Sequence, residues 1–132
     1  MVTMFYTGLC VLLVLLLSVR VAAWRFRQKI DLGDGGDSEM LRRMRAHGNA
    51  AEHMPLALLL LGGLELNGYD ARLIHTFGGV FVASRALHAF AVSSKSGLPG
   101  GRLLGMAFTW LPMLAMAVLA IYGYFQQGAP AP

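Results

Sequence analysis

The stretch VTMFYTGLCVLLVLLLSV, residues 2–19, decides the fold class because its eighteen positions carry no charge. As a helix rising about 1.5 Å per residue, it would span about 27 Å, close to the thickness of a bilayer's hydrocarbon core. Basic residues follow this stretch, starting at Arg20, whereas a cleavable signal peptide carries its basic residues in front. We therefore expect a retained membrane helix at about residues 2–29.

The composition of the whole chain supports a membrane protein. The sequence has 132 residues, of which 56% are hydrophobic and 14% charged, against roughly 25% charged residues in an average soluble protein. This balance excludes a soluble enzyme, a disordered tail and a secreted disulfide scaffold, and the single Cys10 forms no internal bridge. We expect one transmembrane domain, residues 1–132, with room for four spans of about 20 residues each.

Three more helical segments follow the first one, separated by short loops rich in Gly, Asp, Asn or Pro. Asp37 or Ser38 is placed to cap the second helix. We expect these helices at about residues 39–66, 71–93 and 102–124. The predicted fold is an all-α, integral membrane four-helix bundle, and the tail at residues 128–132 is expected to be disordered.

The basic residues predict the orientation of this bundle. The second loop has Arg72 alone. Nine basic residues flank the first and third loops, namely Arg20, Arg25, Arg27, Lys29, Arg42, Arg43, Arg45, Lys95 and Arg102. The positive-inside rule places those two loops in the cytoplasm and both termini outside. The net charge of +4 therefore indicates membrane topology and gives no reason to expect nucleic acid as a partner.

Polar side chains inside the expected spans are the candidates for function. Arg45, Asn49 and Glu52 are spaced by four and three residues, which puts them along one helix face. Arg85 and His88 lie three apart on the third helix. An ionised group in hydrocarbon costs at least about 2.5–3.5 kcal/mol, so each must face a partner, a cavity or the interface.

Two interpretations of these side chains remain open on spacing alone. In the first, Arg85 and Glu52 pair across the helices and the remaining donors surround a polar ligand. In the second, the same groups form only a structural network, with an Arg85–Glu52 pair and Asn49 bonding across the bundle. A metal site is disfavoured, because the four His residues and Glu52 have no recognisable ligand spacing.

The stretch RRMRAHGNAAEHMPL, residues 42–56, resembles a specific family signature. An Arg, an Asn four residues later, a Glu three further on and a Pro-containing apolar run are typical of the membrane-associated proteins in eicosanoid and glutathione metabolism (MAPEG). The resemblance also includes the four helices, the basic end of the first helix and the Arg-x-x-His pair at Arg85 and His88. The Gly-Asp-Gly-Gly loop before the second helix is similar to that of the small bacterial branch.

The resemblance implies a homotrimer that binds glutathione, as co-substrate, between subunits near the cytoplasmic face. The matching glutathione-binding positions are Arg25, Arg45, Asn49, Glu52, Arg85 and His88, and Arg102 corresponds to a thiolate-stabilising Arg. The arginines suit the two carboxylates of glutathione, Glu52 suits its ammonium group and Asn49 suits its peptide backbone. Val92 stands where many members have a Tyr, and Gly48 where some have a basic residue.

The function expected from this resemblance is that of a membrane-embedded glutathione-binding protein, with glutathione transferase or peroxidase-like activity on hydrophobic electrophiles. Its expected partners are further copies of itself, membrane lipids and a hydrophobic small-molecule substrate. Its expected location is the bacterial inner membrane. The alternative is a non-catalytic trimeric membrane protein that binds lipid head groups or serves a structural role. A transporter is disfavoured, because four short helices show no inverted repeat.

Overall fold

The fold consists of four helices. The computed structural model describes residues 1–93 and 101–126, except for the side chains of Gly101 and Arg102, and this part contains no strand. The helices are α1 (Val2–Gln28), α2 (Ser38–Leu66), α3 (Ala71–Ser93) and α4 (Gly101–Gln126). The all-α fold is confirmed, and each helix begins and ends within two residues of its expected position. The expected third loop and the C-terminal tail lie outside the described residues, apart from Gly101.

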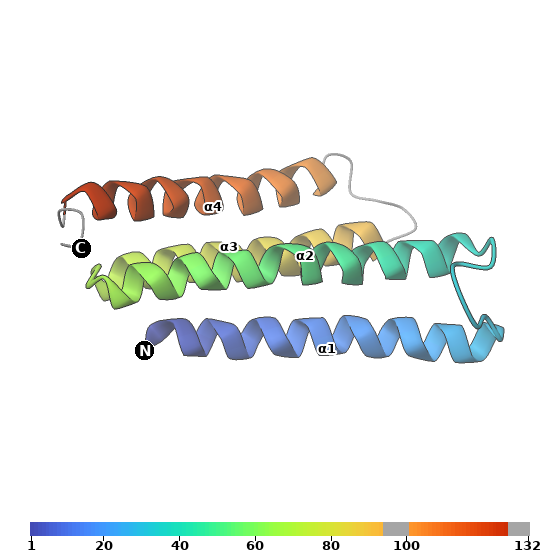
Figure 1. Ribbon diagram of the computed structural model, residues 1–132. Coiled ribbons are helices and arrows are strands. Elements are labelled where there is room, and N and C mark those ends of the chain that lie inside the picture. Colours follow the sequence, from blue (N-terminus) through green and yellow to red (C-terminus); the bar gives the residue numbers. More distant parts are fainter. Residues whose placement is uncertain (94–100, 127–132) are drawn as a thin grey trace.

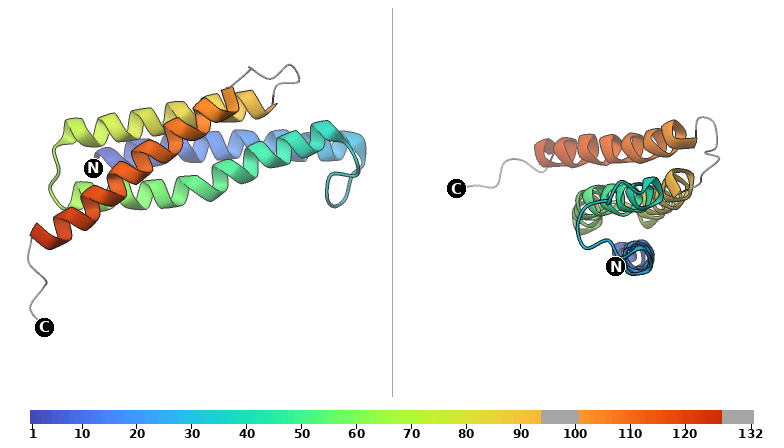
Figure 2. Two further views of the ribbon diagram at one scale, coloured as in Figure 1. Left: turned by 90° about the horizontal axis from the view of Figure 1, so that it is seen from above. Right: turned by 90° about the vertical axis from the view of Figure 1, so that its right-hand side faces the viewer.

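The helices run antiparallel in three layers. The start of α1, the α2–α3 turn and the end of α4 lie at one end of the bundle, and the α1–α2 loop lies at the other end (Figure 1). Viewed along the bundle, α2 and α3 form the middle layer, with α1 on one face and α4 on the opposite face (Figure 2). Within the described residues α1 contacts α2 and α3 but not α4.

A cluster of contacts ties the end of α1 to the start of α2. Asp37 is the N-cap of α2, and its carboxylate accepts hydrogen bonds from the backbone N–H of Glu39 (2.7 Å) and of Met40 (3.1 Å). The indole N–H of Trp24 on α1 donates to the other oxygen of the same carboxylate at 3.0 Å. Of the two residues expected to cap α2, Asp37 therefore does so.

Near the opposite end, α1 and α3 approach closely at a glycine. The ring of Tyr6 lies directly on Gly78, where an added Cβ would come within 2.4 Å of a ring carbon. The Tyr6 hydroxyl donates to the backbone carbonyl of His75 at 3.0 Å and lies 3.0 Å from Nδ1 of the same residue. Because Gly78 has no side chain, the ring of Tyr6 fits between the two helices and is 7% exposed.

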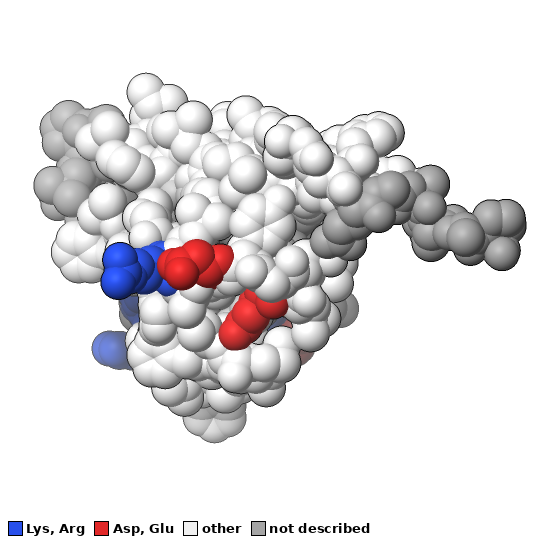
Figure 3. Space-filling model, turned by 90° about the vertical axis from the view of Figure 1, so that its left-hand side faces the viewer, with Lys and Arg blue, Asp and Glu red and all other residues white. Residues whose placement is uncertain are grey.

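Among the described residues, two helical segments have the length and composition of membrane spans, namely α1 and residues Leu103–Gln126 of α4. Both carry large apolar side chains on the surface, such as Leu12 (65% exposed) and Leu111 (62% exposed). The end that holds the start of α1 has only scattered charge (Figure 3). The basic residues expected to face the cytoplasm, where the structure describes them, belong to the other end of the bundle.

Candidate functional site

A buried network centred on Arg85 joins three helices. Arg85 on α3 is 2% exposed. One arm of its guanidinium donates to the side-chain oxygen of Asn49 on α2. The other arm donates to the backbone carbonyl of Gly105 at 3.2 Å and to the hydroxyl of Thr109, both on α4. The Thr109 hydroxyl also lies 3.1 Å from that of Ser84. Arg85 is thus held by backbone and side-chain acceptors on α2 and α4.

The expected pair between Arg85 and Glu52 is wrong. Glu52 is exposed on α2, and within the described part of the chain it makes no ion pair or hydrogen bond. The spacing of three residues puts Glu52 only about 60° around the helix from Asn49, yet Asn49 is half-buried and Glu52 is exposed. Arg85 therefore contacts Asn49, and Glu52 is left on the open face of α2.

A polar pocket lies in front of this network, at the end of the bundle that carries most of the basic residues. Its volume is about 470 Å³, within the range of about 300–1,000 Å³ that is typical of small-molecule sites. Residues from α2, α3 and α4 line it: Ser38, Leu41, Arg42, Arg45, Asn49, His88, Val92 and Met106. The structure thus brings together three of the predicted residues, Arg45, Asn49 and His88, on the wall of one pocket.

The other predicted residues lie elsewhere. Arg85 sits behind Asn49 and does not line the pocket. Arg25, at the end of α1, donates to the backbone carbonyl of Ile30 at 3.2 Å and lines a separate pocket together with Lys29. Arg102 belongs to the first turn of α4, and its side chain lies outside the described residues.

Arg42 and Thr109 are functional candidates that the family signature does not mark. Arg42 lies one turn before Arg45, so its position in the pocket follows from helical spacing. Its guanidinium also forms an ion pair with Glu39 at 2.8 Å. Thr109 is 0% exposed within an apolar stretch of α4, and no sequence pattern indicates that it contacts Arg85.

The first turns of α2 are fixed from outside the pocket. The guanidinium of Arg43 lies 4.4 Å from the ring centre of Trp24 and forms an ion pair with Glu39 at 2.8 Å. The backbone N–H of Met40 and then the indole N–H of Trp24 hold the pKa of Asp37 below its usual value. A charged Asp37 therefore helps to position the part of α2 that carries Arg42 and Arg45.

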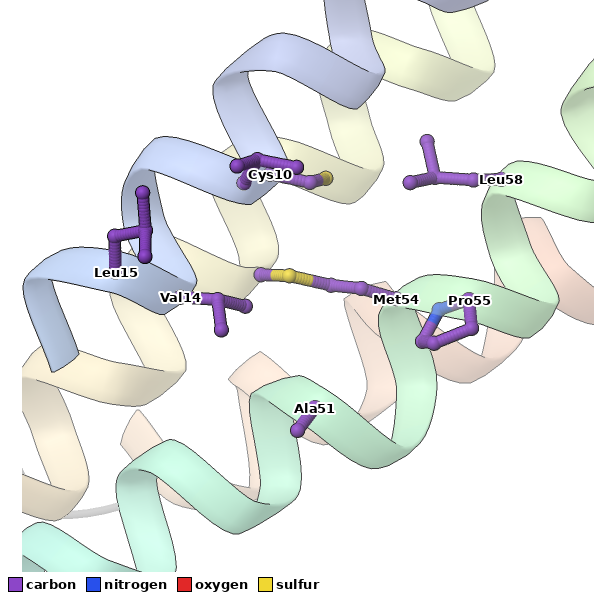
Figure 4. Close-up of a pocket in the computed structure, with 8 residues that line it drawn as sticks. Cys10, Val14, Leu15, Ala51, Met54, Pro55 and Leu58 are labelled. Atoms are coloured by element: carbon purple, nitrogen blue, oxygen red, sulfur yellow. The ribbon is translucent and has the colours of Figure 1, made fainter. Parts of the chain in front are cut away.

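A second, apolar groove lies between α1 and α2. It has a volume of about 420 Å³, and its lining is apolar apart from the thiol of Cys10. Figure 4 shows Cys10 and Val14 facing Met54 and Ala51 across this groove. Ala51 precedes Glu52 in α2, so this wall of the groove lies about 100° around that helix from Glu52.

Comparison with known proteins shows which family this arrangement belongs to. Residues 3–122 match the sequence profile of the MAPEG family, which is most of the chain. The chain belongs to the MAPEG family. The resemblance drawn from the residue 42–56 motif is thereby confirmed.

Two similar relatives of this MAPEG protein are Inner membrane protein YecN of Escherichia coli strain K12 and the protein of the same name from Escherichia coli O6:H1. Each is 34% identical over 122 residues, a match that covers 92% of this chain and 92% of the relative. The similarity therefore extends over all four helices and is consistent with a bacterial branch of the MAPEG family.

Proposed function

We propose that this MAPEG protein binds glutathione in the membrane and presents its thiolate to a hydrophobic electrophile or hydroperoxide. The polar pocket carries the proposal, because it joins Arg45, Asn49 and His88 in a space of suitable size. Guanidinium groups and an amide are the donors that carboxylates and peptide carbonyls require. Glutathione offers two carboxylates and two peptide groups.

The open face of α2 supports assembly into a homotrimer. Arg45 and Glu52 lie two turns apart on this face, both exposed, and Leu56 and Leu59 continue it at 59% and 73% exposure. Within the described residues neither charged group has an ionic partner. Because ionised groups are costly against lipid, we propose that further copies of the chain cover this face. Glu52 then accepts hydrogen bonds from the ammonium group of glutathione at the interface between two copies. Arg25 of the neighbouring copy contributes to the same site.

The apolar groove suits the second substrate. An electrophile dissolved in the bilayer reaches the surface between α1 and α2 without crossing water, and an apolar chain fits beside Val14 and Met54. In the transferase reaction the thiolate sulfur bonds to the electrophilic carbon, and the electron pair passes to the leaving group or the opened ring. By family resemblance, Arg102 at the start of α4 favours the thiolate, as does the helix N-terminus.

The proposed location is the bacterial inner membrane, with four spans and both termini outside the cytoplasm. Helices of 27, 29, 23 and 26 residues are each long enough to cross a bilayer. The relatives from Escherichia coli are named as inner membrane proteins, which supports this location. The proposed partners are membrane lipids and further copies of the chain.

A thermal melt with glutathione tests binding directly. In detergent, millimolar glutathione should raise the Tm of the wild type, and Arg45→Ala and Glu52→Gln should each abolish the increase. Arg72→Ala, at the opposite end of the bundle, is the control and should keep it. An unchanged wild-type Tm would contradict binding. Conjugation of an aromatic electrophile, with thiolate absorbance as a second readout, then separates an enzyme from a binder.

Two observations favour the alternative of a non-catalytic membrane protein. Arg85 donates to Asn49 and to Thr109 within a single chain, as in a structural network. In addition, Arg25 and Lys29 form a basic pocket at the end of α1, where lipid phosphates are found. Stabilisation by anionic lipid together with no effect of glutathione would favour this alternative.

A further inference from the structure

The contact between Arg85 and Asn49 fixes which way the Asn49 amide faces. A guanidinium group has only donors, so the atom that it contacts must be the amide oxygen, Oδ1. The reversed amide would place N–H groups against N–H groups. The amide nitrogen therefore has to lie on the other side of the Asn49 side chain, and Asn49 lines the polar pocket.

Arg85 is itself held in place, so the Asn49 amide keeps this orientation. It is 2% exposed, and its second arm is held by the Gly105 carbonyl at 3.2 Å and by the Thr109 hydroxyl. Thr109 is itself fixed, because its hydroxyl donates to the same Gly105 carbonyl at 2.8 Å. Asn49 makes no other side-chain hydrogen bond in the described part of the chain, which leaves its two amide N–H donors for a ligand.

The remaining pocket wall also favours a ligand that accepts hydrogen bonds. Arg42 and Arg45 contribute positive charge, and none of the described residues that line the pocket carries a carboxylate. The charge of Arg42 is partly committed to Glu39 at 2.8 Å. Arg45 and the amide nitrogen of Asn49 are therefore the groups most available to an incoming anion.

We infer that Arg85 is a positioning residue that makes Asn49 an obligate donor, so that the polar pocket selects the glycyl end of its ligand, which carries a carboxylate and no ammonium group. This inference rests on the proposed glutathione binding and refines it. Arg85 then acts through Asn49 instead of touching the ligand. The ammonium-bearing part of glutathione, which needs acceptors, lies away from this pocket and toward Glu52.

The test replaces the amide donor of Asn49 with an acceptor and keeps the contact to Arg85. In Asn49→Asp one carboxylate oxygen still accepts from Arg85, while the other presents an acceptor where the amide N–H groups were. Calorimetric titrations use glutathione and, separately, glutarate as a minimal dicarboxylate. We expect the Kd for both to rise about tenfold or more, with a Tm at or above that of the wild type. Asn67→Asp, the same change at the other end of α2, is the control and should leave both Kd values unchanged.

A second variant assigns the effect to Arg85. Arg85→Lys retains the positive charge but loses the planar guanidinium with its two donor arms, so Asn49 is no longer held in one orientation. Both Kd values should then rise, and Asn49→Asp should cost less in this background than in the wild type, which is the coupling expected for two groups that act together. Additive effects of the two changes would overturn the inference.

The titrations also separate this inference from the proposed function. Wild-type protein that binds glutarate but not glutathione would contradict the proposed function and support the donor pocket. Wild-type protein that binds glutathione, together with an Asn49→Asp variant that binds it equally tightly, would overturn the inference and leave the proposed function standing. Binding of neither probe would overturn both.

Discussion

The carboxylate of Glu65, in the last turn of α2, accepts a hydrogen bond of 2.8 Å from the backbone N–H of Thr3 at the start of α1. Its other oxygen accepts from the N–H of Val2. The first N–H groups of a helix have no partner within the helix. A side chain of α2 therefore completes the N-terminus of α1.

Loss of this contact should free the start of α1. We expect the Tm to fall in the order wild type, Glu65→Gln, Glu65→Ala, because Gln keeps an acceptor oxygen but loses the charge that suits a helix N-terminus. Hydrogen exchange at Val2 and Thr3 should quicken in the same order. Equal exchange in all three proteins would show that the contact does not hold the helix.

The close approach at Gly78 predicts a pair of contrasting substitutions. Gly78→Ala places a methyl group 2.4 Å from the Tyr6 ring, which the hydroxyl contact with His75 holds in place. We expect a loss of about 1–3 kcal/mol in the free energy of unfolding, as for other overpacked sites. At Gly79 the atom nearest to an added Cβ is the Tyr6 hydroxyl oxygen, 3.7 Å away. Gly79→Ala should therefore be neutral or stabilising, since Ala favours the helix. Equal effects at the two positions would contradict this packing.

The buried hydroxyl of Thr109 should be necessary for stability. Thr109→Val keeps the shape of the side chain but removes an acceptor from Arg85, which is 2% exposed. An unsatisfied buried donor costs about 1–3 kcal/mol, so denaturant titration should show a loss of that size. Thr109→Ser restores the hydroxyl and should recover most of the stability. A variant with Val that is as stable as wild type would mean that Arg85 finds another acceptor.

The cap of α2 predicts how stability depends on pH. The pKa of Asp37 is lower in the folded protein than its unfolded value of about 3.9. The charged cap therefore contributes its full stabilisation above about pH 5, and this contribution is lost as the pH falls through the folded pKa. The Tm difference between wild type and Asp37→Asn should be largest near neutral pH and shrink below about pH 4. A difference that is constant with pH would exclude the charge of Asp37 as its cause.

The four helices, and the residues that α2 contributes to the polar pocket, can be predicted from the sequence. An uncharged run of eighteen residues fixes α1 by length alone, and the spacing of Arg45 and Asn49 puts both on one side of α2 whatever the packing. The partner of Arg85 depends instead on how α3 is rotated against α2 and α4. Opposite charges predict a pair between Glu52 and Arg85, but the packing of the helices turns Asn49 toward Arg85.

Other parts of the site have no local signal at all. Thr109 lies in an apolar helix whose sequence does not mark the neighbour of its hydroxyl. The glycine pair at 78 and 79 predicts a close helix contact, but only the three-dimensional arrangement shows that the Tyr6 ring lies on Gly78, while at Gly79 an added Cβ would lie 3.7 Å from the Tyr6 hydroxyl. These features depend on residues far apart in the chain, and a single sequence does not reveal such pairs.

The contact of Glu65 with the start of α1 also bears on how the chain is made. The ribosome synthesises Val2 and Thr3 more than sixty residues before the carboxylate that completes their helix. During translation the first turn of α1 therefore stays open until α2 has followed it into the membrane. The contact therefore joins the two far ends of the α1–α2 hairpin only after both helices have been made.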